Sequence, residues 1–435
     1  MSKIFIIISI LVIFFFNYNS ISNASTEVVS DNSVQTSSEL GFRSSRSIDK
    51  DENDIDTGNG TDKRYLKQTN DRAQFFSDIK YKFGQEFDDP EVNVGFRAYK
   101  KFTTYGEDSA ELRTLVLKDK GTYYSSVWGL QFVNWSETFG LNILDIVNPR
   151  DFSEFIFEDL SASKIPVWAF KTSILLDKFT IQPIYVPQAR NYIVPPKGSF
   201  FDPIPKVLDA IVRVPAKDKK IFTDHEYGLK LAYLFSFGLD FSLIYYSYYH
   251  RIPVYYLNLS DFKLHLADDK RVTSYGNSFT YSNGGLVLRG DTLFTKEVPY
   301  FSNDFIYRIS DQWQGIYGLD YTFENQIIIG SQFHFENINE NKWISFQIKK
   351  SIGNFDLQAM YFTGINNKDL WIRPEITWHF LNIHQIRLYA DILSRGSEST
   401  SNGNNAVGDS VGNKNGILEY YSKKDQIIFT YSCQF

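Results

Sequence analysis

The last ten residues of the chain, QIIFTYSCQF at Gln426–Phe435, decide how the rest of the sequence is interpreted. Successive side chains on a β-strand point to opposite faces, so this stretch has one apolar face and one mostly polar face. Such a strand suits a wall with lipid on one side and water on the other, although a soluble β-sandwich could also end in it. The apolar face carries Ile427, Phe429, Tyr431, Cys433 and Phe435.

An aromatic residue at the end of such a strand resembles the C-terminal signature of bacterial outer-membrane β-barrels. The resemblance implies that strand 426–435 pairs with the first strand, which removes the open sheet edge. It also implies that the barrel-assembly machinery binds this strand. The composition agrees, because 17% of the residues are aromatic while only 43% are hydrophobic. This combination is typical of alternating strands with aromatic girdles.

The first 72 residues show no strand pattern and divide into two parts. An apolar run over 4–16, followed by Ser22-Asn23-Ala24, predicts a secretory signal peptide at 1–24 that is cleaved after Ala24. Residues 25–72 are rich in Ser, Asn, Asp and Lys. We expect them to be a disordered extension, because they cannot bury enough apolar surface to offset their ordering entropy. The barrel is predicted over 73–435, surrounded by the lipid of the bacterial outer membrane.

From residue 74 onward, alternating segments of about ten residues follow one another, as tilted membrane-crossing strands require. They predict an all-β fold, a transmembrane antiparallel β-barrel of about 16 strands (roughly 14–18) with an inward-folding charged loop. The segment 227–249 is interpreted as two strands that turn near Gly238. Leu370–Phe380 and Ile383–Leu393 alternate most clearly between bulky apolar and polar residues. Their polar faces give the predicted lumen-lining residues Arg373, Glu375, His379, Arg387 and Asp391.

Residues 135–164 interrupt the strand rhythm and are strongly charged. They contain Asn148-Pro149-Arg150-Asp151, and Asp151 precedes Glu154 by three residues, as in a helix capping box. We expect a short helix over 152–160 in a loop that bends into the lumen and narrows it. The predicted pore constriction consists of Asp145, Arg150, Asp151, Glu154 and Glu158.

A structural interpretation of the same element stays open beside this one. The Asn148-Pro149 turn could shape the loop while Arg150 pairs with a wall carboxylate and holds it in place. The two interpretations are compatible, because a stable constriction needs a tethered loop. A second interruption, 189–224, is rich in proline. We expect it either to cap the pore or to form a surface loop with its own apolar cluster.

The sequence lacks the motifs of several common classes of enzyme. It contains no G-x-S-x-G, H-E-x-x-H or phosphate-binding loop, and its six histidines are scattered. No catalytic, cofactor-binding or metal site is therefore predicted. The single cysteine, Cys433, excludes an intrachain disulfide. The net charge of −6, without a basic cluster in the sequence, gives no reason to expect nucleic acid as a partner.

Residues 122–203 include NWSETFGLNILDIVNPRDFSEF at 134–155, IPVWAFKTSILLDKFTIQPIYVP at 165–187 and PPKGSFF at 195–201. This part resembles a family of proteobacterial outer-membrane proteins with an Asn-Pro-Arg-Asp element after an early strand. The resemblance implies a porin-like barrel with a largely unassigned substrate and no catalytic residues.

We therefore expect a channel for the passive diffusion of small solutes. A surface adhesin or structural barrel is the alternative, and an outer-membrane hydrolase, which would need a Ser and a His on one face, is a further one. The sequence leaves the transported solute and the oligomeric state open, a homo-oligomer included.

Overall fold

The computed structural model describes residues 33–434 apart from 50–64, 85, 87, 103–108, 139–141, 154–161, 198–211, 215–216, 252–254, 259, 267–269, 302–306, 366–368 and 395–424. The signal peptide predicted at 1–24 lies outside the described residues, and so do Glu154, Glu158 and most of the helix predicted at 152–160. The elements are β1 (Ser33–Asp49), β2 (Tyr65–Lys82), β3 (Glu91–Lys101), β4 (Ser109–Gly121), β5 (Tyr124–Gln131), β6 (Val167–Leu176), β7 (Phe179–Val186), β8 (Glu226–Leu234), β9 (Leu239–Tyr249), β10 (Tyr255–Asn258), β11 (Lys263–Leu266), β12 (Arg271–Asn283), β13 (Leu286–Phe301), β14 (Tyr307–Thr322), β15 (Ile328–Glu336), the 3₁₀ turn η2 (Ile338–Glu340), β16 (Lys342–Ile352), β17 (Phe355–Gly364), β18 (Leu370–Phe380), β19 (His384–Ser394) and β20 (Asp425–Gln434).

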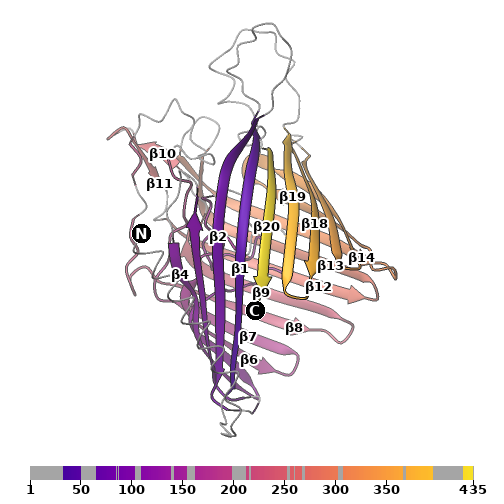
Figure 1. The fold of residues 1–435 in the computed structure, drawn as a ribbon. Coiled ribbons are helices and arrows are strands. Elements are labelled where there is room, and N and C mark those ends of the chain that lie inside the picture. Colours follow the sequence, from indigo (N-terminus) through magenta and orange to yellow (C-terminus); the bar gives the residue numbers. More distant parts are fainter. Residues whose placement is uncertain are drawn as a thin grey trace, which may run out of the picture.

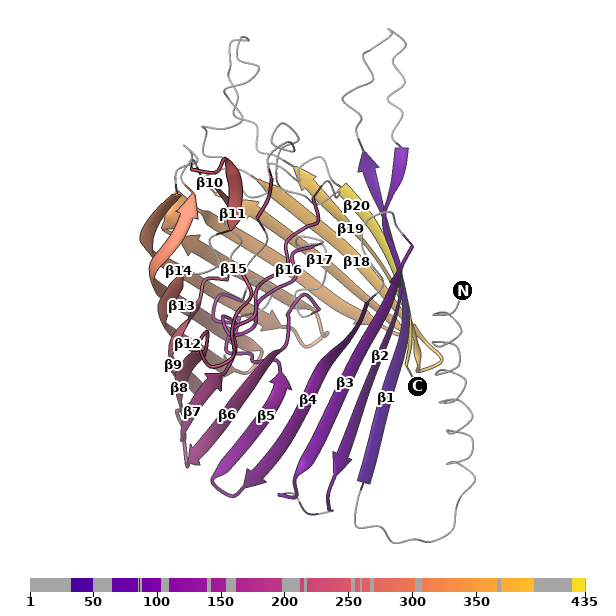
Figure 2. The ribbon, with the colours of Figure 1, turned by 90° about the vertical axis from the view of Figure 1, so that its left-hand side faces the viewer.

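Eighteen of these strands form one closed antiparallel β-barrel (Figures 1 and 2). Each strand pairs with its neighbours around the ring, and the ring closes where β20 pairs with β1. In that closing pair Leu40 lies opposite Cys433, and Phe42 lies opposite Tyr431. The predicted pairing of the last strand with the first is confirmed. The strand number is 18 rather than about 16, at the upper limit of the predicted range.

The barrel begins earlier in the chain than residue 73, where the sequence analysis placed its start. Strand β1 lies entirely within the stretch predicted to be disordered, and β2 begins at Tyr65. The alternation in β1 is hard to recognise, because its outer face carries Thr36 and Ser38 beside Leu40 and Phe42. Backbone hydrogen bonding to β2 on one side and β20 on the other holds this polar strand in the sheet.

A small separate sheet lies between β9 and β12, in the segment 255–266. This segment forms the two short strands β10 and β11, which pair with each other and not with the barrel. The turn predicted near Gly238 is present between β8 and β9, and this glycine has a φ of 88°. A residue without a Cβ adopts such a left-handed conformation without strain.

The outer face of the barrel is apolar and carries a band of aromatic rings. Five aromatic side chains from β8, β9, β12, β13 and β14 contact one another in sequence, with neighbouring ring centroids 4.5 to 6.5 Å apart. These five, the upper girdle, are Tyr227, Tyr245, Tyr275, Phe294 and Trp313. A second set of rings, the lower girdle, lies at the end of the barrel with the short turns and includes Tyr233, Phe235, Phe237, Tyr281, Tyr321, Phe323, Phe355, Trp378 and Phe380.

The two ends of the barrel differ. One end carries short turns, for example at Leu381 and Asn382 between β18 and β19, where both residues have positive φ values of 51° and 60°. The start of β1 and the end of β20 lie at this same end (Figure 1). The long connections between β5 and β6 and between β7 and β8 leave from the opposite end. No helix among the described residues is long and apolar enough to cross a membrane.

Candidate functional site

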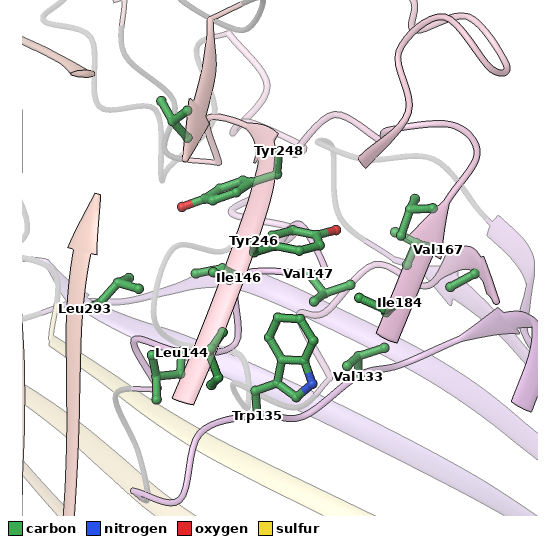
Figure 3. Close-up of a cluster of buried hydrophobic side chains, with 14 residues drawn as sticks. Val133, Trp135, Leu144, Ile146, Val147, Val167, Ile184, Tyr246, Tyr248 and Leu293 are labelled. Carbon is green, nitrogen blue, oxygen red and sulfur yellow. The ribbon is translucent and has the colours of Figure 1, made fainter. Parts of the chain in front are cut away.

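The segment between β5 and β6, here called the first loop (residues 132–166), folds into the barrel and packs on its inner wall. Its inward direction follows from the alternation in β6, where Val167 and Ala169 contact the loop cluster while Trp168 and Phe170 are 47% and 53% exposed on the outside. Wall strands β6, β7, β9, β12 and β13 contribute to this cluster (Figure 3). The inward-folding loop predicted from the sequence is therefore present. Its buried apolar residues are Val133, Trp135, Leu144, Ile146 and Val147.

Asn148 closes the base of the first loop. Its Oδ1 accepts a hydrogen bond from the Val133 amide at 2.7 Å, and its Nδ2 donates to the carbonyls of Gln131 and Ile165 at 3.1 and 2.9 Å. The Ile165 amide also donates to the Pro149 carbonyl at 2.8 Å. Because Asn148 is only 2% exposed, these bonds form away from bulk water and stabilise the loop base. The Asn-Pro part of the motif thus has a structural role.

Asp145 forms the buried ionic anchor of the first loop. Its carboxylate lies 2.6 Å from the Lys164 ammonium, and the two side chains are 1% and 8% exposed. The same carboxylate accepts hydrogen bonds from the backbone amides of Trp135 and Ser136 at 2.8 and 3.1 Å. The residue predicted to line a constriction is therefore engaged within the loop.

Asp291, on wall strand β13, binds the part of the first loop that contains Ser136 and Thr138. This carboxylate is fully buried and accepts hydrogen bonds from the hydroxyls of Ser136 and Thr138, the latter at 3.0 Å. The Trp135 indole donates to Gln182 of β7 at 2.9 Å. Contacts to two separate parts of the wall fix the course of the loop within the lumen.

Arg150 and Asp151 join the first loop to the segment between β7 and β8, here called the second loop (residues 187–225). The Ile193 amide donates to the Arg150 carbonyl at 3.1 Å, and the Phe152 amide donates to the Ile193 carbonyl at 2.9 Å. The Arg150 guanidinium lies 3.4 Å from the Ser163 hydroxyl. Burial lowers the pKa of Arg150, and the nearby Asp145 carboxylate opposes this shift.

Arg251, just after β9, ties both loops to the wall. Its guanidinium donates to the carbonyls of Val147 and Arg190, each at 2.9 Å, and forms an ion pair with Glu226 at the start of β8. Glu226 is fully buried and also accepts hydrogen bonds from the Tyr246 hydroxyl and the Tyr249 amide. One arginine therefore holds segments of both loops and a wall strand.

A charged cavity lies on the opposite side of the first loop, against strands β1, β2, β19 and β20. It has a volume of about 360 Å³, and Ala162 is the residue that lines it among those of the first loop that the structure describes. The Ala162 carbonyl accepts hydrogen bonds from Arg97 and Arg113 of β3 and β4, each at 3.3 Å. The cavity is lined by Glu39, Arg43, Arg72, Gln74, Phe76, Asp78, Ala162, Arg387, Tyr389 and Thr430.

The five predicted lumen residues of β18 and β19 lie in different environments. Arg387 lines the cavity. Arg373 and Asp391 form a buried two-point ion pair at 2.6 and 2.9 Å. Glu375 is half-buried, and His379 is exposed and lies 2.9 Å from the Asp356 carboxylate. The structure therefore does not gather these residues into one site.

Sequence reasoning missed Asp291, Glu226, Arg251 and the arginines of β1 and β2. Each lies far along the chain from its contacts. Asp291, Glu226 and the arginines of β1 and β2 have one sequence signal, a charged residue on the inward side of an alternating strand, and Arg251 lies outside the strands. No group of three or more His, Cys, Asp or Glu side chains that could hold a metal ion occurs in the described part of the chain.

Solved structures of similar fold include three outer-membrane proteins of Pseudomonas aeruginosa. OccK8 (OprE) is 10% identical to this chain with a TM-score of 0.54, and the match covers 92% of this chain and 98% of OccK8. OccK5 (OpdH) and OpdQ are each 11% identical with a TM-score of 0.52, again over 92% and 98% of the two chains. At this low identity the likeness shows the shared barrel fold. No curated protein matches the sequence.

A family model does match the sequence, over residues 127–384. The matched region begins in β5 and ends at the first residue of β19, so it includes both loops and the wall residues Gln182, Glu226, Arg251 and Asp291 that bind them. The match covers more than half of the chain, and the protein therefore belongs to the family described as "Protein of unknown function (DUF1302)".

Proposed function

We propose that the protein is a passive channel for small solutes in the bacterial outer membrane. One observation carries this proposal: the closed barrel holds its first loop against one side of the inner wall and keeps a charged cavity on the other side. A barrel with an apolar exterior and a polar interior is the arrangement that lets water and solutes cross a bilayer.

The spacing of the two aromatic girdles supports the membrane location. Trp313 of the upper girdle and Phe323 of the lower girdle are ten residues apart along one strand and its end. Ten residues of strand span about 33 Å, or about 23–27 Å across the membrane at a tilt of 35–45°. This height agrees with the apolar band of about 25 Å that separates the girdles of membrane barrels.

The anchoring of the first loop supports a passage of fixed width. Gln182 of β7, Asp291 of β13 and Arg251 after β9 each bond the loop to the side of the barrel away from β1, β2, β19 and β20. A loop tethered at several points keeps a constant distance from the opposite wall. We therefore assign the narrowest part of the channel to the space between Ala162 and this wall.

Planar-bilayer recording of the refolded, full-length protein tests the channel. Discrete and stable current steps are expected from preparations in which heat-modifiable gel mobility shows an intact barrel. Salt-gradient reversal potentials on the same channels give the ion preference. A barrel that is folded by the gel assay and inserted in the bilayer, but passes no current, would refute the proposed function.

The sequence-based prediction that Arg150, Asp151 and Glu154 belong to the constriction is tested separately. Replacing Arg150 with alanine, or Asp151 and Glu154 together, is expected to change conductance or ion preference while the barrel stays folded. Lys270→Ala serves as the control, because this cation pairs with the exposed Glu297 outside the loops. Wild-type single-channel behaviour in the Arg150 and Asp151/Glu154 variants would exclude them from the constriction without affecting the barrel.

A further inference from the structure

The second loop ends in a tight turn, here called the outer turn (residues 220–225). The Asp224 amide donates to the Lys220 carbonyl at 2.9 Å, and the Asp224 carboxylate accepts a hydrogen bond from the Lys220 amide at 2.7 Å. The Phe222 amide donates to the Pro187 carbonyl, just after β7, at 2.7 Å. These bonds fix the backbone of the turn, whereas the side chains of Ile221 and Phe222 are 59% and 70% exposed. The turn therefore presents two large apolar groups on a rigid support.

The outer turn is continuous with the upper girdle. The ring centre of His225, its last residue, lies 5.8 Å from that of Tyr185 and 6.0 Å from that of Tyr227, a member of the girdle. The fully buried Glu226 points into the barrel, so its two neighbours His225 and Tyr227 share the outer face. Strand β8 runs from Tyr227 toward the lower girdle, so the turn lies beyond the upper girdle, on the side away from the lower one. In membrane barrels such girdles lie at the level of the lipid headgroups.

Two cations on the outer face also lie beyond the upper girdle. Arg271, the first residue of β12, precedes Tyr275 of the girdle by four residues, and Lys296 of β13 follows Phe294 by two. Even spacing along a strand keeps a side chain on the same face, so both cations share the outer face with the girdle. Because Lys296 is the direct partner of Thr273, the two cations are diagonal neighbours, about 7–8 Å apart. One phosphate group can therefore lie between them.

The contacts of these two cations are with uncharged groups. The Arg271 guanidinium donates to the His225 carbonyl at 2.6 Å and to the Ser247 hydroxyl at 3.3 Å, and it lies 4.8 Å from the centre of the Tyr249 ring. The Lys296 ammonium lies 5.8 Å from the centre of the Tyr275 ring. These contacts position the cations beside the outer turn and do not cancel their charge.

The carboxylates of this region are engaged with other groups. Asp224 accepts a hydrogen bond from the Tyr249 hydroxyl at 2.8 Å, and Glu297 lies 2.6 Å from the Lys270 ammonium. Asp311 of β14 accepts a hydrogen bond from the Glu297 amide at 3.0 Å. Residues 217–225 together with 270, 271, 296, 297 and 311 contain six Lys or Arg and four Asp or Glu, which gives a net charge of +2. The region is therefore positive, whereas the whole chain has a net charge of −6.

From this geometry we infer that the outer turn, Arg271 and Lys296 form a binding site for a phosphate-bearing lipid of the adjacent leaflet. Ile221 and Phe222 enter the boundary between headgroups and acyl chains, as the apolar side chains of interfacial segments do. The two cations bind the phosphate, and each Lys or Arg near an anionic lipid surface strengthens binding about five-fold. A water-soluble anion would use the cations but leave both apolar side chains in water, so their combination favours a lipid. The inference needs the membrane location and goes beyond the conduction of solutes.

The first test measures the lipid preference of the full-length protein, refolded into phosphatidylcholine vesicles. Spin-labelled phosphatidic acid, which carries a phosphate monoester, is compared with spin-labelled phosphatidylcholine through the fraction of immobilised label. Wild type is expected to bind phosphatidic acid more strongly. Arg271→Gln and Lys296→Gln should each lower this preference by up to about five-fold.

Two features of the design separate binding from folding. Lys296→Gln leaves the hydrogen bonds of the outer turn in place, and heat-modifiable gel mobility verifies the barrel in every variant. Arg289→Gln is the matched control, because it also removes one cation, which pairs with Asp320 at 2.7 Å on the inner wall. It is expected to leave the lipid preference unchanged.

The second test locates the outer turn. In a Cys433→Ser background, Phe222→Cys carries a nitroxide label, and its access to oxygen, which dissolves in lipid, is compared with its access to a water-soluble nickel complex. Phe262→Cys is the matched control. Phe262 is 71% exposed and has a φ of 51°, close to the 61° of Phe222, but it lies in the β10–β11 hairpin, which does not pair with the barrel. Oxygen should reach the label at 222 more readily than nickel does, and the reverse is expected at 262.

Each outcome supports or overturns a part of the inference. Equal binding of the two lipids by wild type, or a preference that survives in both glutamine variants, overturns the phosphate site. Nickel access at 222 equal to that at 262 overturns the lipid contact of the turn. Dipolar broadening between labels at 222 would place a second copy of the chain on this face and overturn the lipid as its occupant. None of these readouts uses ionic current, so a failure of the proposed channel would appear separately, as a barrel that binds the lipid but does not conduct.

Discussion

The buried ion pair between Asp145 and Lys164 gives the sharpest test of how the first loop is held in the lumen. Replacing Asp145 with alanine removes the acceptor of the Lys164 ammonium and of the backbone amides of Trp135 and Ser136. The ammonium still has the Asn134 side chain at 2.5 Å, which is neutral and cannot balance its charge. The variant should therefore loosen the fold of this part of the loop, because all the bonds that it removes join residues of the loop itself.

The magnitude follows from burial. Removing one partner of a buried ion pair costs about 3–5 kcal/mol, because the other charge stays in a poorly solvated place. The barrel itself should remain assembled, since its strand pairing does not involve Asp145. The loss is thus expected in the local opening of the loop. It corresponds to an increase of about two to three and a half orders of magnitude in the open population.

Hydrogen exchange of peptides covering residues 132–138, followed by mass spectrometry, measures this opening directly. Faster exchange there, with wild-type exchange in β16 to β18 and a larger or noisier single-channel current, is the expected result. Glu297→Ala is the control, because it breaks an exposed ion pair, which is worth about 0–1 kcal/mol. The double variant Asp145→Leu, Lys164→Met should restore part of the protection, since it leaves no unpaired charge. Wild-type exchange at 132–138 in Asp145→Ala would refute the anchoring role of the ion pair.

Three further changes test other parts of the structure. Asn148→Ala removes three buried hydrogen bonds and should destabilise the loop base by about 2–4 kcal/mol, which amide exchange at Val133 measures. Arg251→Lys loses the fork that binds carbonyls of both loops, so the current should become noisier while gel mobility stays unchanged. Wild-type current noise in this variant would show that the guanidinium of Arg251 is not needed to hold the loops. Leu243→Arg places a charge on the outer face of β9, where Leu243 is 50% exposed, and should cost about 2–4 kcal/mol in unfolding from vesicles. An unchanged unfolding midpoint would argue against lipid contact at that position.

Alternation with period two was sufficient to predict the C-terminal half of the barrel. In β18 and β19, Ile376 and Leu388 are 40% and 44% exposed on the outer face, whereas Thr377 and Tyr389 are buried on the inner one. The alternation can be recognised in the sequence because the face toward lipid carries apolar residues and the face toward the lumen carries polar ones. The inward course of the first loop was also predictable, from its charged residues and its apolar ones together.

The anchors of that loop were not predictable from the sequence. Asp291 and Ser136 are 155 positions apart, and their contact depends on how far the sheet curves before it closes. The charged residues of the motif at 148–151 were predicted to be its functional part. In the structure its asparagine makes the hydrogen bonds that close the loop base, because a buried amide can both accept and donate. The arginines of β1 and β2 were missed for a related reason, since Arg43 and Arg72 lie far apart along the chain and become neighbours only through strand register.

The first strand explains why composition misleads in this fold. A soluble domain must bury apolar side chains to order a segment, and Ser33–Asp49 has few of them. In a closed barrel the same segment fills the last gap between two strands, and without it β2 and β20 would each expose an edge of unpaired amides and carbonyls. In lipid each such group costs several kcal/mol, so backbone pairing alone is sufficient to hold a polar strand there. The same freedom from packing lets β1 carry Arg43 on its inner face. The strand that the composition hides therefore also supplies Glu39 and Arg43 to the charged cavity.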